Sequence, residues 1–175
     1  MPRKNPPQFS EPSRDRLLTD LRGLSRKLNK CVDDARWEKA EEIDSQIELL
    51  MQLAGSRFSP IILDAANARA RLAIINRCID VAEIHVSFVS DVCLNRPSGE
   101  WTTQFADCLE CASRVAMARK DWELFGFCLE KCAEIRARVL GTQHPDSLRA
   151  AREWEMFLDV MTDPSLDGSE ANQCR

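Results

Sequence analysis

The segment Trp37-Glu38-Lys39-Ala40 has a counterpart 85 residues further along the chain, Trp122-Glu123-Leu124-Phe125. The same offset relates Pro60 to Pro145 and Leu63 to Leu148. It is about twice the 40-odd residues of a helical-hairpin repeat, so the sequence predicts an internally repeated array of helices. Arrays of this kind act mostly as extended surfaces that bind other proteins.

The composition favours helices and one globular domain. The chain has 175 residues, of which 44% are hydrophobic and 30% charged, and it contains no tyrosine and six glycines. Strand and turn signals are therefore poor, and the length suits a single cooperative domain. A net charge of −4 argues against general nucleic-acid binding, which draws on an excess of Lys and Arg.

Other features bear on location. The sequence has no run of about 18 apolar residues, so we expect no membrane-spanning helix. The first residues, Met1-Pro2-Arg3-Lys4, do not begin the apolar core of a signal peptide, which favours the cytoplasm. In that reducing setting we expect the eight cysteines to be thiols.

Periodic apolar residues divide the chain into helices. Leu17, Leu21, Leu24, Leu28 and Cys31 alternate at spacings of four and three, which lines one face of a helix. The whole pattern predicts an all-α protein with a disordered Pro-rich lead-in at 1–13 and a helical domain at 14–161. Its expected parts are hairpins at about 14–55, 60–94 and 100–141, a final helix at 146–161, and a flexible polar tail at 162–175.

Two segments resemble a known family. Ala35-Arg-Trp-Glu-Lys-Ala-Glu-Glu-Ile43 resembles the turn and second-helix start of a tetratricopeptide repeat. Arg138-Val-Leu-Gly-Thr-Gln-His-Pro-Asp-Ser-Leu-Arg-Ala150 resembles the segment between repeats in the longer variant found in kinesin light chains, whose period near 42 residues halves the observed offset. The resemblance implies a right-handed array of three antiparallel hairpins, capped by a C-terminal helix. The stretch Leu28–Leu50 also resembles a short hairpin by which nucleotide-excision-repair subunits contact each other, but that motif does not explain the 85-residue offset.

Two positions depart from the tetratricopeptide pattern. Cys78 stands near the place of the turn aromatic in the middle hairpin, so the repeat is weakest there. The small residue after the turn is kept as Ala40 but replaced by Phe125, and we expect the large side chain to push the helices of the third hairpin apart.

The resemblance also implies a binding surface, because the first helix of each hairpin lines the concave face of such arrays. The positions that would point outward from it are Arg22, Ser25, Asn29, Asp64, Asn67, Arg71, Asp107, Glu110, Arg114, Arg149 and Arg152. Arginine outnumbers acid in this set, and guanidinium groups suit carboxylates. The candidate partner-binding residues are Asn29, Asn67, Arg71, Arg114, Arg149 and Arg152.

Four cysteines form the sharpest local pattern. Cys108 and Cys111 precede the expected third turn, and Cys128 and Cys132 follow it at symmetrical distances, so Cys108 would face Cys132 and Cys111 would face Cys128. We favour plain packing, since cysteine behaves as a small apolar residue. The alternatives are a Zn or Cu(I) site of four thiolates and a pair of disulfides.

No acid–base pair or glycine-rich phosphate loop marks the chain as an enzyme. We therefore predict a non-enzymatic protein–protein interaction module, an adaptor or scaffold that binds a protein or peptide partner and needs no cofactor, nucleic acid or membrane. The alternatives are a helical bundle that binds metal through the four cysteines and a self-associating structural protein whose contact is the stripe from Leu17 to Cys31.

Overall fold

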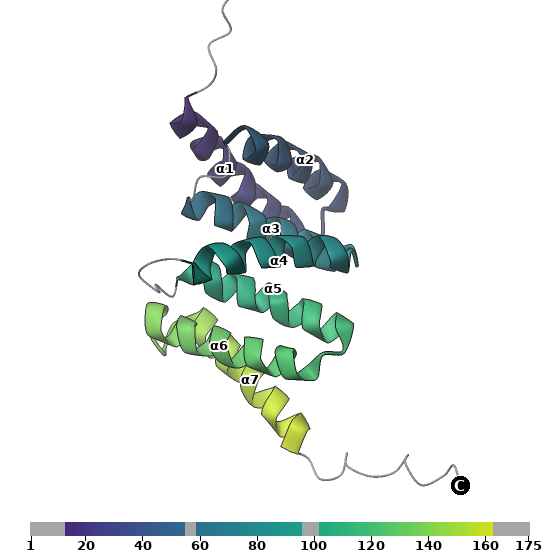
Figure 1. Cartoon of the computed structure of the whole chain (residues 1–175), viewed down its shortest axis with the longest axis vertical. Coiled ribbons are helices and arrows are strands. Elements are labelled where there is room, and N and C mark those ends of the chain that lie inside the picture. The colour runs from purple at the N-terminus through teal and green to yellow at the C-terminus, as the bar shows by residue number, and fades with distance from the viewer. Residues whose placement is uncertain (1–12, 55–58, 96–101, 163–175) are drawn as a thin grey trace, which may run out of the picture. The chain divides into compact units, whose positions relative to one another are not determined.

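The protein consists of helices wherever the computed structural model describes it, at residues 13–54, 59–95 and 102–162 (Figure 1). No strand occurs within those ranges. This confirms the prediction of an all-α protein with seven helices. The helices are α1 Arg14–Asp33, α2 Trp37–Ala54, α3 Pro60–Ile75, α4 Ile79–Leu94, α5 Thr103–Arg119, α6 Trp122–Leu140 and α7 Pro145–Thr162.

Three turns between helices share one backbone geometry. Ala35, Arg77 and Lys120 have positive φ angles of 55°, 59° and 61°, and each stands two residues before the next helix begins. In every case its amide donates to the carbonyl three residues back, and the following amide donates to the carbonyl five residues back. This is the Schellman arrangement, which satisfies the last carbonyls of a helix.

These turns lie 42 and 43 residues apart, which divides the 85-residue offset almost in half. The chain therefore does turn at Cys78, although no aromatic residue marks the place. A Schellman turn is made by backbone hydrogen bonds, so the side chain at that position is free to vary. Helices α3, α5 and α7 begin at the matching spacings of 43 and 42 residues.

Side-chain caps fix where several helices begin. Ser59 precedes Pro60 at the start of α3, and its Oγ accepts from the amide of Ile61 at 3.3 Å. Ser is a favoured cap and Pro a favoured first residue of a helix. Thr102 accepts from Phe105 at the start of α5, and Asp121 caps α6 by accepting from the amide of Leu124 at 3.0 Å.

The described residues fall into two compact units, whose boundary lies within α3, between Ala68 and Arg69. In the first unit α1 packs against α2. The stripe that predicted α1 is buried there, since Leu21 and Leu28 are inaccessible to solvent, as is Ile47 of α2. Burying a side chain of this size stabilises a fold by about 1.5–3 kcal/mol. Most of the stripe therefore lies in the core of this unit, with Leu24 only half-buried.

In the second unit α5 packs against both α4 and α6, and α6 packs against α7 (Figure 1). The helices meet through small buried residues, which let their backbones approach closely. The small buried residues of these helices include Ala82, Ala106, Cys108, Cys111, Ala116, Cys128 and Cys132. Among the described helices none is long and apolar enough to cross a membrane.

The two ends of the chain lie outside the described residues. The predicted disordered lead-in covers 1–13, of which only Ser13 is described, just before α1. The predicted tail at 162–175 lies beyond the described part except for Thr162, which is the last residue of α7 and accordingly helical.

Candidate functional site

Two of the predicted partner-binding arginines of the second unit, Arg149 and Arg114, are engaged with acids of the same unit. Arg149 of α7 contacts Glu110 of α5 with two nitrogens, each 3.3 Å from a carboxylate oxygen. Arg114 of α5 pairs more loosely, at 3.6 Å, with Glu153 of α7. Arg152 is exposed and forms no ion pair with the residues described here.

At the centre of these contacts lies Arg136 of α6, which the sequence did not single out. Its side chain is 6% exposed, and its Nη2 lies 2.9 Å from Asp107 Oδ1 and 2.5 Å from Glu110 Oε2. The structure thus gathers two of the predicted concave-face acids, Asp107 and Glu110, around one buried guanidinium. With Arg149 this Arg136 network joins α5, α6 and α7.

The network fixes the charge of Glu110. Burial by itself would raise the pKa of this carboxyl, but the charge and hydrogen bond of Arg136, together with Arg149 and Arg114, outweigh burial and lower it. A buried charge is tolerated only when it is paired and hydrogen-bonded. Glu110 is therefore a structural anion, committed to its arginines.

The other predicted positions differ in exposure. Ser25 is buried and donates to the carbonyl of Leu21 in its own helix at 2.8 Å. Asn67 is buried, and Arg71 is half-buried near Cys111. Of the rest in the first unit, Arg22 is exposed and Asn29 and Asp64 are half-buried.

The four cysteines are buried, as packing residues would be. Cys108 Sγ donates to the carbonyl of Val86 in α4 at 3.4 Å, and Cys132 Sγ donates to that of Ala106 at 3.3 Å. Cys108 thus points toward α4, near Cys93 and Cys128, and not toward Cys132 as its symmetrical spacing suggested. The reason is that α5 has a neighbour on each side, whereas the spacing argument considered only α6.

Burial also keeps these thiols protonated. It raises the pKa of Cys108 and Cys132 to about 12 and that of Cys128 to about 11, and it raises the pKa of Cys111 as well. Metal binding requires the thiolate form. In the described part of the chain no group of three or more His, Cys, Asp or Glu side chains is arranged to hold a metal ion.

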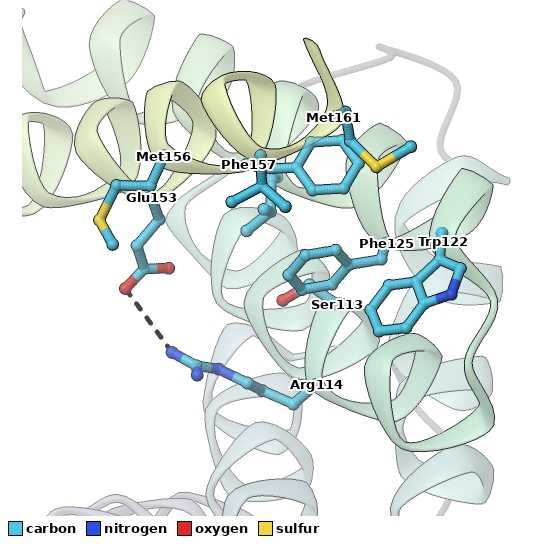
Figure 2. Close-up of a pocket in the computed structure, with 10 residues that line it drawn as sticks. Ser113, Arg114, Trp122, Phe125, Glu153, Met156, Phe157 and Met161 are labelled. Carbon is cyan, nitrogen blue, oxygen red and sulfur yellow. Dashed lines mark ion pairs between the residues drawn. The ribbon is translucent and has the colours of Figure 1, made fainter. Parts of the chain in front are cut away.

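An open apolar pocket lies where α7 meets α5 and α6 (Figure 2). Its volume is about 450 Å³. No pattern in the sequence indicated this pocket, although Arg114, which lies at its edge, is one of the predicted binding residues. The lining consists of Ser113, Arg114, Trp122, Phe125, Leu129, Glu153, Met156, Phe157, Val160 and Met161.

Aromatic rings form one wall of the pocket. Phe125 of α6 meets Phe157 of α7 edge-on at 5.3 Å between ring centres, and Trp122 meets Phe125 in the same manner at 6.2 Å. On its other side Phe157 stacks on Trp154 at 5.7 Å. Edge-on and offset pairs are worth about 0.5–1.5 kcal/mol beyond the area they bury.

Gly126 allows Phe157 to approach α6 so closely. A Cβ atom at this position would lie 2.5 Å from Cε1 of the Phe157 ring, inside contact distance. The ring therefore packs on bare backbone. The sequence predicted that Phe125 would separate the helices of the third hairpin, but its ring faces α7 instead, and α5 and α6 make the most extensive contact among the described helices.

The pocket is open to solvent along its apolar residues. Met156 is 68% exposed, Val160 59%, Met161 58% and Trp122 50%. Neighbouring apolar side chains exposed to this degree are typical of a surface that another molecule covers. Met156 and Met161 add adaptability, because methionine is unbranched and flexible.

A second groove of similar volume, about 450 Å³, lies between α1 and α2. Leu24, Leu49 and Leu50 line it, but so do Asp20 and Lys27. The mixture of charged and apolar residues gives it less apolar surface to bury than the pocket at α7.

The chain matches no model of a known protein family, and no curated protein shows significant similarity to it. The resemblance to tetratricopeptide repeats therefore stays a prediction from the residues. What the fold contributes is a set of neighbouring helices that pack in order, with a recurring turn, compatible with a helical repeat.

Proposed function

We propose that this protein is a non-enzymatic interaction module that binds a protein or peptide partner in the pocket between α5, α6 and α7. The observation that carries the proposal is the group of exposed Met156, Val160 and Met161 beside the aromatic residues Trp122 and Phe125. Covering such residues removes apolar surface from water, and this stabilises a complex by about 25 cal/mol per Å². The surrounding helices hold the pocket in shape before binding, which lowers the ordering cost.

We further infer that the seven helices form three antiparallel hairpins in a right-handed array closed by α7, as in tetratricopeptide proteins. The three equivalent turns at Ala35, Arg77 and Lys120 support this inference, because equal turns at nearly equal spacing generate equal hairpins. The seven described cysteines are free thiols, which suits a cytoplasmic location.

The proposal moves the binding surface away from most of the predicted arginines. Arg149 is held by Glu110, and a partner's carboxylate would have to displace that contact. Arg114 is the exception, since it lies at the edge of the pocket and its contact with Glu153 is long.

A comparison of three forms of the protein as baits in lysate of its native cell tests the proposal. Met156→Glu places a charge in the pocket, and Leu158→Glu places the same charge on α7 at a residue that does not line it. We expect at least one protein to be retained by the wild type and by Leu158→Glu but lost from Met156→Glu. Identical sets of retained proteins for all three baits would contradict a role for the pocket.

A further inference from the structure

Three polar side chains that line the pocket, Ser113, Arg114 and Glu153, already have partners within the protein. Ser113 donates to the carbonyl of Glu110 at 2.7 Å, and Arg114 pairs with Glu153 at 3.6 Å on one edge (Figure 2). Because this pair neutralises itself, the pocket presents no net charge to an occupant. The side chains that enter it must accordingly be uncharged and apolar.

The same shortage of hydrogen-bonding groups restricts the backbone of the occupant. An extended peptide buried here would lose water from its amides and carbonyls and find few partners, and each unsatisfied group costs about 1–3 kcal/mol. A helix forms these hydrogen bonds within its own backbone. The lining therefore favours a helical occupant over an extended one.

The volume indicates how many side chains enter. A cavity of about 150 Å³ holds one molecule of benzene, and this pocket has about 450 Å³. A single apolar side chain would leave much of it empty. Two large side chains fill it better, and on a helix residues three or four apart project from the same face.

We propose that the pocket accepts an amphipathic α-helix of a partner protein, which inserts two large apolar side chains three or four residues apart. This inference rests on the proposed function, since it names the class of partner that the same pocket binds. Trp122 and Met161 at one edge, and Met156 at the other, cover the sides of the inserted pair (Figure 2).

Selection from two displayed peptide libraries tests the proposal. One library presents randomised positions on an alanine-rich helix, and the other presents the same residues in an unstructured peptide with proline at its centre. The full chain is the bait, and Met156→Glu is used to remove peptides that bind elsewhere. Affinities of the recovered peptides are then measured by fluorescence anisotropy.

We expect binders from the helical library with apolar pairs at spacing three or four. Met156→Glu should weaken them by about tenfold or more, since a charge would be buried without a partner. Leu158→Glu should change their affinity by less than about twofold, because exposed sites outside an interface contribute little. Proline in the middle of a recovered peptide should abolish binding, because it breaks the helix.

The possible failures are distinguishable. Binders that come from the proline library and lose affinity with Met156→Glu would overturn the helical partner and leave the proposed function standing. If no peptide from either library depends on Met156, both proposals fail.

Concentration-dependent dimers in sedimentation that Met156→Glu abolishes would assign the pocket to a second copy of the chain. A gain of about tenfold in peptide affinity on deleting residues 163–175 would assign it to the chain's own C-terminal segment, by competition. Either of these two results overturns the helical partner.

Discussion

Helices α4 and α5 meet beside buried apolar residues, whereas their counterparts α6 and α7, together with α5, line an apolar pocket. The offsets of 43 and 42 residues place Phe125 where α4 has Ala82, and Phe157 where α5 has Val115. Ala82 and Val115 are both buried, at 0% and 7% exposure. The first junction is thus filled by small residues and the second by two aromatic rings.

An ion pair distinguishes the two junctions further. Arg119 of α5 contacts Asp80 and, at 3.1 Å, Glu83 of α4. The counterparts of Arg119 and Glu83 are Met161 and Gly126, so the same contact cannot form between α6 and α7. Within this unit, junctions between equivalent helices therefore differ through a few side chains, and an apolar pocket is found at the α6–α7 junction.

The α6–α7 junction has an anchor of its own in the Arg136 network, since the counterpart of Arg136 in α4 is Cys93. Arg136→Met keeps much of the volume but leaves Glu110 buried without its nearest partner. We expect a loss of about 3 kcal/mol in the free energy of unfolding, the low end for breaking a buried ion pair. Denaturant unfolding measures it.

Arg138→Met is the matched control, because Arg138 is exposed and, among the residues that the structure describes, pairs with Glu134 of the same helix alone. Exposed pairs of this kind contribute about 0.3–0.5 kcal/mol. Equal losses for the two variants would contradict the anchoring role of Arg136.

The next largest effect comes from exchanging the residues that distinguish the junctions. Ala82→Phe forces a ring into a filled contact, and we expect a loss of about 2 kcal/mol from overpacking. Phe125→Ala removes a half-buried ring at the pocket, and we expect a smaller loss of about 1 kcal/mol from its contact with Phe157. Thermal and denaturant unfolding measure the two losses in stability. A larger loss for Phe125→Ala than for Ala82→Phe would show that the contact between α4 and α5 can accommodate an aromatic ring.

Gly126→Ala should disturb the second junction by about 1 kcal/mol, because the new Cβ meets the Phe157 ring and the gain in helix propensity offsets part of the strain. The pocket should change shape, which a change in Trp122 fluorescence would report. Gly23→Ala is the control, since nothing lies within 4 Å of a Cβ at that position. If both substitutions stabilise the protein equally, Phe157 does not pack on Gly126.

The smallest expected effect is a dependence on pH. The pKa of Glu110 is lowered in the folded state, so its stabilising contribution is present above the unfolded value near 4.5 and is lost as the pH falls through the lower folded value. In Arg136→Met the charge of Arg136 no longer outweighs the effect of burial on the pKa of Glu110. The stabilising contribution of the Glu110 carboxylate therefore shrinks. The stability difference between wild type and variant should therefore narrow as the pH falls from about 6 to below 4.5, as measured by urea unfolding. A stability difference that does not change with pH would show that Arg136 does not stabilise the charged form of Glu110.

The helices were predictable from the sequence because their signals are local. Pro60 and Pro145 begin α3 and α7, and Trp37 and Trp122 begin α2 and α6, as the 85-residue offset indicated. The turn at Cys78 was harder to predict, since its geometry is set by backbone hydrogen bonds that leave no mark on side chains.

The candidate site was not predictable in the same way. Arg136 meets Glu110 across 26 residues of sequence, and no local pattern relates them. The pocket depends on the direction of the Phe125 ring, which points toward α7 and not toward α5. The sequence shows that Phe125 lies on α6, but it does not show which helix the ring contacts. Aligning α5 with α7 would have given one clue, because Met161 replaces the charged Arg119.

The most direct test of the account is the NMR signal of the methionine methyl groups during titration with benzene. The chain has five methionines, of which Met156 and Met161 line the pocket, while Met117 is 42% exposed elsewhere on α5. Enclosed apolar cavities bind benzene, and we expect this open apolar pocket to bind it as well. We predict saturable shifts at Met156 and Met161 and none at Met117. Shifts that are linear with concentration and equal at all three methionines would contradict the existence of the pocket.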